Sequence, residues 1–222
     1  MGKKVIITGA TGMVGGIAQE LCLASDQVDQ VISIVRRPSG TEHEKLQELI
    51  VPDLLNYEPD PVGFQDVDAV LFCIGVYTGA VARDEFRRIT VDIPMAFAKH
   101  LHAHSPQAIF CLLSGAGADR TEKSRFMFAK DKGVVENLLS AVGFQAFHTF
   151  RPGYIYPVTP RDEPNLSYRI SRALYPLIRL MGNNASIKST ELAQGMFEVG
   201  VAGASAEEIL ENRDILALLP TS

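Results

Sequence analysis

The sequence predicts an α/β fold in which a doubly wound parallel sheet carries helices on both faces. Three observations support this class. Short apolar runs typical of buried strands alternate with stretches of helical periodicity. The first of these runs leads through a glycine turn directly into an amphipathic helix, the opening unit of a Rossmann-type sheet. The 222 residues are 46% hydrophobic and 21% charged, as is usual for a globular protein.

Six strands are expected from the apolar runs. They fall at residues 5–7, 30–35, 49–51, 68–75, 108–113 and 144–150. Val, Ile, Leu and Phe dominate them, because the strands of a parallel sheet are covered on both faces. The polar stretch at 41–48 is expected to be loosely helical at most.

Helices are expected between these strands and after the last one. The first begins at the glycine turn, and others are expected at residues 83–103, 126–142, 166–181, 190–203 and 207–219. Pro94 should kink or restart the second helix, because proline cannot donate its backbone hydrogen bond. We expect a single domain over residues 1–222, with a small helical C-terminal part at 156–222.

The turn after the first strand has three glycines, Gly9, Gly12 and Gly15, in the spacing GxxGxxG. A diphosphate requires a tight turn whose backbone approaches closely and whose helix-start amides point at the anion. A glycine turn used only for packing would need fewer glycines. The strand–turn–helix context therefore favours a dinucleotide site.

Composition narrows the class further. The net charge of −5 argues against a general nucleic-acid-binding protein. The three cysteines lie in apolar runs and indicate buried thiols in a reducing compartment, and no run is long enough for a membrane span. With the first strand starting near residue 4, these features predict a cytoplasmic protein without a signal peptide. His100, His102 and His104 do not share one helical face, so no metal site is expected.

Arg36 and Arg37 follow the second strand at its carboxyl end, where NAD-specific proteins often place an acidic residue. Asp29 has a similar offset from the glycines but precedes the strand. An arginine can pair with a 2′-phosphate and stack on adenine. The pair favours NADP(H) over NAD(H), although two arginines in a solvated loop would look the same.

Four segments carry a resemblance to a known family. TGATGMVG, VRRP, SGAGAD and RPGYIYP, beginning at residues 8, 35, 114 and 151, resemble the short-chain dehydrogenase/reductase superfamily. Within it, the chain looks like the atypical branch of Tat-interacting-protein-like NAD(P)-binding oxidoreductases. The resemblance implies a cofactor across the carboxyl ends of the strands. The implied cofactor contacts are Gly9, Thr11, Gly12, Met13, Val14, Arg36, Arg37, Asp53, Leu54, Cys73, Ile74, Gly75, Lys132, Pro152, Gly153, Tyr154 and Ile155.

Reductases of this superfamily use a Tyr-x-x-x-Lys pair on the helix after the fifth strand. Here Lys132 is present, but Phe128 occupies the tyrosine position and has no proton to give. Losing a catalytic acid lowers rates by about 10²–10⁴. Lys132 is expected to hold ribose hydroxyls rather than to transfer protons.

Other side chains could act with Lys132. Ser114 ends the fifth strand and could contact a ribose or substrate oxygen, or only local backbone. Tyr77 follows the fourth strand and could supply the missing acid. Tyr154 and Tyr156 lie on the same edge and could do the same, although packing is the favoured role for all three tyrosines.

Two functions remain open from the sequence. The first is an NADP(H)-binding oxidoreductase that reduces a small carbonyl substrate without the usual tyrosine. The alternative is a catalytically weak or inactive NADP(H)-dependent sensor or adaptor that binds a protein partner, which Phe128 favours. A nucleotide-sugar epimerase is less favoured, because few residues follow the RPG segment. The oligomeric state stays open.

Overall fold

The computed structural model describes residues 2–57, 61–77, 79–159, 175, 182 and 184–220. In this part of the chain the main sheet has seven strands in the order β3-β2-β1-β4-β5-β6-β9, and every neighbouring pair is parallel. The strands are β1 (Lys3–Thr8), β2 (Val28–Val35), β3 (Leu46–Ile50), β4 (Ala69–Phe72), β5 (Ile109–Leu113), β6 (Ala146–Arg151) and β9 (Ile209–Glu211). The predicted doubly wound sheet is confirmed.

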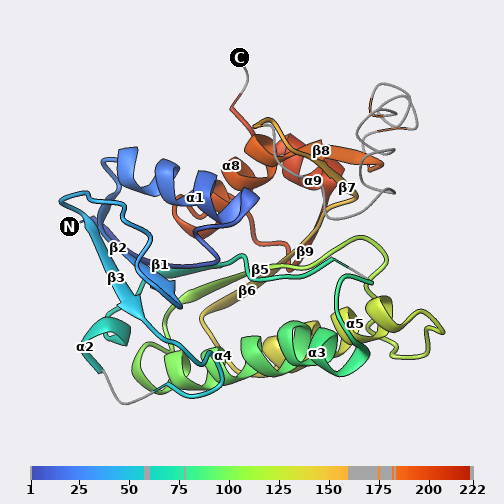
Figure 1. Cartoon of the computed structure of the whole chain (residues 1–222). Helices are drawn as coiled ribbons and strands as arrows, with labels where there is room; N and C mark the ends of the chain where they lie inside the picture. Colours follow the sequence, from blue (N-terminus) through green and yellow to red (C-terminus); the bar gives the residue numbers. More distant parts are fainter. Residues whose placement is uncertain are drawn as a thin grey trace.

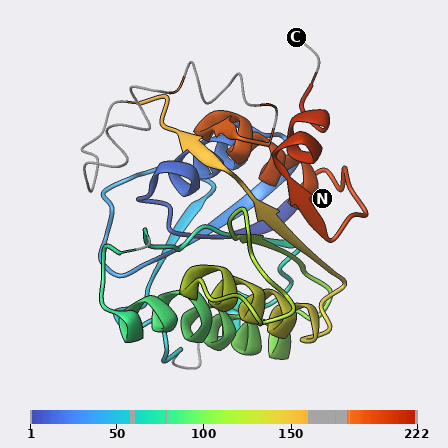
Figure 2. The same cartoon turned by 90° about the vertical axis from the view of Figure 1, so that its right-hand side faces the viewer.

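Helices cover both faces of this sheet (Figures 1 and 2). On one face lie α1 (Met13–Ala24), α8 (Ser189–Gly200) and α9 (Asn212–Ala217). On the other lie α3 (Arg83–Arg87), α4 (Ile93–His104) and α5 (Met127–Ser140), and the short α2 (Pro61–Phe64) is beside them. Two hydrophobic clusters fill the two interfaces, because alternate strand residues such as Ile6 and Ile7 face opposite sides.

The predicted helix at 83–103 is interrupted just before Pro94. A π-helical turn, η1 (Arg88–Asp92), joins α3 to α4. Pro94 lies in the first turn of α4, where its missing N–H removes no hydrogen bond. The irregularity is therefore in the turn that precedes the proline.

Two sequence-based assignments were wrong. Residues 46–48, expected to be loosely helical, belong to β3 and pair with 31–33 of β2. Their polar side chains are tolerated because β3 is the edge strand of the sheet.

The C-terminal part was expected to be helical, but it also contains strands. Residues 209–211 form β9, which pairs with β6, and β7 (Tyr154–Tyr156) pairs with β8 (Ser186–Lys188) in a second small sheet. Helix α8 packs against α1 and completes one face of the main sheet. The helix expected at 166–181 lies, apart from residue 175, outside the described residues.

Candidate dinucleotide site at the carboxyl ends of the strands

The turn between β1 and α1 lies at the switch point of the sheet, where β1 and β4 are neighbours. Gly9 has a φ of +73°, and a Cβ on it would lie 2.9 Å from the carbonyl oxygen of Cys73. A Cβ on Gly15 would lie 2.3 Å from the carbonyl oxygen of Gly9. Side chains at either position would push the turn away from β4 and from its own helix, so glycine is required there.

The start of α1 is open. Gly12 precedes the helix and has no side chain to cap it, and both Thr11 and Gly12 are exposed. The turn is held by a hydrogen bond from the amide of Gly12 to the carbonyl of Gly9, 2.8 Å long. The first helical hydrogen bond runs from the amide of Gly16 to the carbonyl of Gly12, at 3.0 Å. The amides of residues 13–15 precede any intrahelical acceptor. This uncapped row of amides fits a diphosphate.

The end of β4 borders this turn. The amide of Cys73 donates to the backbone oxygen and to Oγ1 of Thr8, both at 3.2 Å. Cys73 and Ile74 are half-buried, whereas Gly75 is exposed and a Cβ on it would meet no atom of the described residues within 4 Å. Burial raises the pKa of the Cys73 thiol to about 12, so the thiol is not a nucleophile near neutral pH.

Arg36 and Arg37 are exposed and follow directly after β2 at the same edge of the sheet. Among the described residues neither guanidinium has an ion-pair or hydrogen-bond partner. Two unpaired cations at this edge are available to an anionic ligand.

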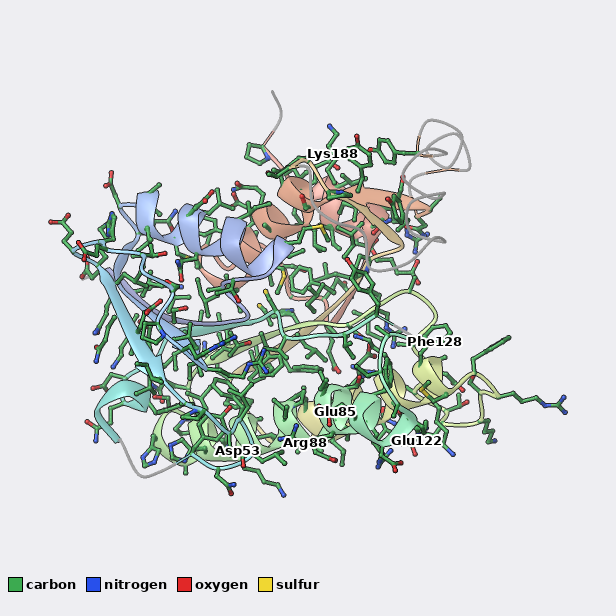
Figure 3. The ribbon with its side chains drawn as sticks, viewed as in Figure 1. Asp53, Glu85, Arg88, Glu122, Phe128 and Lys188 are labelled. Atoms are coloured by element: carbon green, nitrogen blue, oxygen red, sulfur yellow. The ribbon has the colours of Figure 1, made fainter. Side chains whose placement is uncertain are left out.

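The two residues expected beside adenine differ in environment. Asp53 accepts the amide of Leu55 and pairs with Arg88 at 3.2 Å (Figure 3). The bond from the Leu55 amide holds the pKa of the Asp53 carboxyl below its usual value. Leu54 is buried in the hydrophobic cluster beneath α4. Only Asp53 of this pair therefore presents a side chain to solvent.

Helix α5 positions Lys132 beneath the end of β5. Its Nζ donates to the backbone oxygen of Ser114, at 3.1 Å. Burial lowers the pKa of Lys132 to about 8, although the nearby Glu136 carboxylate opposes this shift. The structure thus brings together two of the predicted catalytic residues, Lys132 and Ser114, through a backbone carbonyl.

Phe128 lies one turn before Lys132 at the start of α5 (Figure 3). Its ring is half-buried, and its Cε2 would be 4.0 Å from a Cβ on Gly117. The neighbouring ring of Phe126 is 71% exposed. No proton donor therefore occupies the position of the usual tyrosine.

Ser114 and Tyr77, the other two predicted catalytic residues, lie in different environments. The Ser114 hydroxyl is buried and donates to Oε1 of Glu136 at 2.6 Å, so its proton is engaged and the oxygen can only accept further bonds. Tyr77 is half-buried in the loop after β4, where its carbonyl accepts the amide of Ala80. A catalytic role for Tyr77 stays a prediction.

Residues 152–155, which follow β6, are held by hydrogen bonds and packing from several other segments. The carbonyl of Pro152 accepts the amide of Ala116 at 2.8 Å, and the amide of Gly153 donates to Oδ1 of the buried Asn212. A Cβ on Gly153 would lie 2.6 Å from the carbonyl oxygen of Ala185, which also accepts the amide of Tyr154. Ile155 packs against the cluster beneath α8. The predicted nicotinamide-flanking residues thus form a rigid wall of this edge.

Two buried carboxylates on α5 were missed by sequence reasoning. Asp131 accepts both Nη atoms of Arg83, at 2.6 and 2.9 Å, and Nη1 of Arg87 at 3.2 Å. Glu136 is likewise buried and binds two arginines. The i, i+4 spacing of Lys132 and Glu136 was a visible signal, but the burial of both acids depends on tertiary packing.

A parallel sheet whose switch point carries a glycine turn and an uncapped helix start defines a dinucleotide-binding Rossmann protein. Residues 5–197 match the NAD dependent epimerase/dehydratase family, and the chain belongs to that family. Its members bind NAD(P) cofactors and include oxidoreductases. The resemblance to the short-chain dehydrogenase/reductase superfamily is confirmed. The narrower Tat-interacting-protein-like branch stays a prediction.

Relatives and solved structures agree with this assignment. Protein fmp52, mitochondrial, from Emericella nidulans is 26% identical over 159 residues, 68% of this chain and 66% of that protein. The chain thus spans about two thirds of that relative. A short-chain dehydrogenase/reductase from Saccharomyces cerevisiae superposes with a TM-score of 0.66 at 14% identity, covering 99% of this chain and 100% of that one. UDP-glucuronic acid 4-epimerase from Bacillus cereus, solved with NAD, has a TM-score of 0.65 at 16% identity and coverages of 93% and 76%.

The names of the relatives correct one prediction. Four fungal relatives are named mitochondrial proteins, which contradicts the cytoplasmic location expected from the sequence. The expectation failed because buried thiols and a moderate net charge suit more than one reducing compartment. None of the helices in the described residues is long and apolar enough to cross a membrane.

Proposed function

We propose that the protein is an NADP(H)-dependent oxidoreductase that reduces a small carbonyl compound without the usual tyrosine. The observation that carries this proposal is the placement of the Lys132 ammonium, held by the Ser114 carbonyl one helical turn from Phe128. An ammonium group with a lowered pKa is a suitable proton donor near neutral pH. No other side chain at this point of α5 offers a proton.

The proposed cofactor site has three parts. The amides of residues 13–15 would hold the diphosphate, Arg36 and Arg37 the 2′-phosphate, and Pro152–Ile155 the nicotinamide. NADPH, when bound, supplies the hydride that is added to the substrate carbonyl carbon. One Nζ–H of Lys132 is engaged by Ser114, and the other two are available to a ribose hydroxyl and to the carbonyl oxygen. In this proposal Lys132, for which the sequence alone favoured ribose binding, also gives a proton to that oxygen and is reprotonated from solvent.

The preference for NADP(H) is tested by Arg36→Glu. This change reverses the charge beside the proposed 2′-phosphate, so NADPH should bind about 100-fold more weakly while NADH affinity changes little. Fluorescence titration of both cofactors measures the effect. Arg213→Glu, at an exposed arginine on α9, is the matched control and should alter neither affinity. An equal loss for NADPH and NADH would contradict the 2′-phosphate role.

The role of the absent tyrosine is tested by Phe128→Tyr. The new hydroxyl would stand one turn before Lys132, where the superfamily places its acid, so reduction of aldehydes by NADPH should rise about tenfold or more. Phe126→Tyr makes the same chemical change on a mostly exposed ring and should leave the rate unchanged. NADPH oxidation at 340 nm follows both.

Phe128 also favours a second candidate, a cofactor-dependent sensor that binds a protein partner. This function predicts tight NADPH binding with no reduction of any tested carbonyl by the wild type or by Phe128→Tyr. It further predicts that loss of cofactor binding removes partner binding in a folded protein. Measurable turnover by the wild type would contradict it.

A further inference from the structure

Glu136 is a buried carboxylate on α5, beside the carboxyl ends of β5 and β6. It accepts hydrogen bonds from Ser114 Oγ at 2.6 Å, Thr149 Oγ1 at 3.0 Å, Arg120 Nε at 3.0 Å and Arg151 Nε at 3.1 Å, and also from Arg151 Nη2. Burial opposes ionisation, but the bonds from Arg151 and Ser114 outweigh it and hold the pKa of Glu136 below its usual value. Glu136 is therefore an anion at neutral pH.

These bonds join segments that are distant in the sequence. Ser114 ends β5, Arg151 ends β6, and Arg120 lies in the loop before α5. Arg120 also pairs with Glu208, next to β9, at 2.7 Å. One carboxylate on α5 thus joins the carboxyl ends of β5 and β6, and Arg120 extends this network to Glu208, just before β9.

The same carboxylate reaches Lys132 through Ser114. Lys132 and Glu136 are four residues apart on α5 and share a face. The Ser114 hydroxyl bonds to Glu136, while its backbone carbonyl holds the Lys132 ammonium. If Glu136 lost its charge, the bond from Ser114 would weaken, and Lys132 would lose the one carboxylate that favours its charged form, while Arg120 would keep its pair with Glu208.

We infer that Glu136 is a positioning residue of the active site, which fixes the Ser114 hydroxyl beside the Lys132 ammonium and compensates the charge of that ammonium. The inference rests on the proposed function only for the use made of Lys132. Among the described residues, Glu136 on the same helix is the charged group that acts on Lys132, and Arg120 from the preceding loop and Arg151 from β6 act on Glu136.

The test compares Glu136→Gln with Asp131→Asn. Both remove the charge of a buried carboxylate on α5 that binds two arginines. Asp131, however, pairs with two arginines of α3 whose side chains are about half exposed. Solvent therefore screens the change in charge at Asp131, and its effect on Lys132 should be small. The readout is the pH dependence of Lys132 acetylation by acetic anhydride, measured by mass spectrometry on the cofactor-free protein.

In Glu136→Gln the midpoint for Lys132 should fall by about one pH unit, because the opposite charge that favours the ammonium is lost. In Asp131→Asn it should stay at the wild-type value. A purely structural role for Glu136 predicts lower thermal stability in both variants and an unchanged Lys132 midpoint in both, which would overturn the inference.

Glu136→Asp covers the case in which the glutamine variant does not fold. It keeps the charge but withdraws the carboxylate by one methylene, so the bond to Ser114 should be lost and the Lys132 midpoint should fall by a smaller amount. A wild-type midpoint here would also count against the inference. Because acetylation needs no turnover, its outcome is independent of whether carbonyl reduction is found.

Discussion

Lys132→Met is expected to abolish most carbonyl reduction, with kcat/KM falling about 1,000-fold. The change removes the proposed proton donor, and loss of a general acid lowers rates by about 10²–10⁴. NADPH should bind only about tenfold more weakly, since the diphosphate and 2′-phosphate contacts would remain. Steady-state kinetics with NADPH and separate binding titrations distinguish the two effects.

The matched control is Lys130→Met. Lys130 is exposed and lies two residues earlier on α5, where it faces away from Lys132.

In the wild type, kcat should fall as the pH rises through about 8, because the Lys132 pKa is lowered to about 8 and the proton donor is then lost. Unchanged kinetics in Lys132→Met, or a flat profile between pH 7 and 9, would exclude the lysine as the acid.

Gly12→Glu is expected to weaken NADPH binding by more than about 100-fold, which corresponds to roughly 3 kcal/mol of binding free energy. Gly12 immediately precedes α1, beside the amides proposed to hold the diphosphate. A carboxylate there would occupy the helix start and repel the anion. Isothermal titration calorimetry measures the loss.

The fold should survive this change with some loss of stability, because Gly12 is exposed and has a φ of −91°, although the carbonyl oxygen of Gly9, 3.0 Å from its Cβ, would have to shift slightly. Gly12→Ala adds the same Cβ without the charge and should lose clearly less affinity. A melting temperature near that of the wild type shows that the loss is local. Full NADPH affinity in Gly12→Glu would place the cofactor elsewhere.

The winding of the sheet and its glycine turn were predictable because their signals are local. Apolar runs are long enough to mark buried strands, and the glycine spacing reflects backbone contacts within one strand–turn–helix unit. The structure gives the reason for two of these glycines, since Gly9 lies against the end of β4 and Gly15 against Gly9.

The edges of the sheet were harder to predict. Strand β3 mixes apolar and polar residues (LQELI), and β9 has only three residues, so neither shows the apolar run of a central strand. Both form because a neighbour already in place offers its free backbone groups. A pattern within one segment cannot reveal such a partner.

The sequence by itself determined the class of sheet, the dinucleotide turn and the replacement of the usual tyrosine by Phe128, because each depends on residues close together in the chain. Only the tertiary structure decided that the Ser114 proton is engaged by Glu136 and that the half-buried Lys132 lies beside them, bonded to the Ser114 carbonyl. Charges and hydrogen bonds among β5, β6 and α5 depend on distances in space, which sequence spacing does not encode.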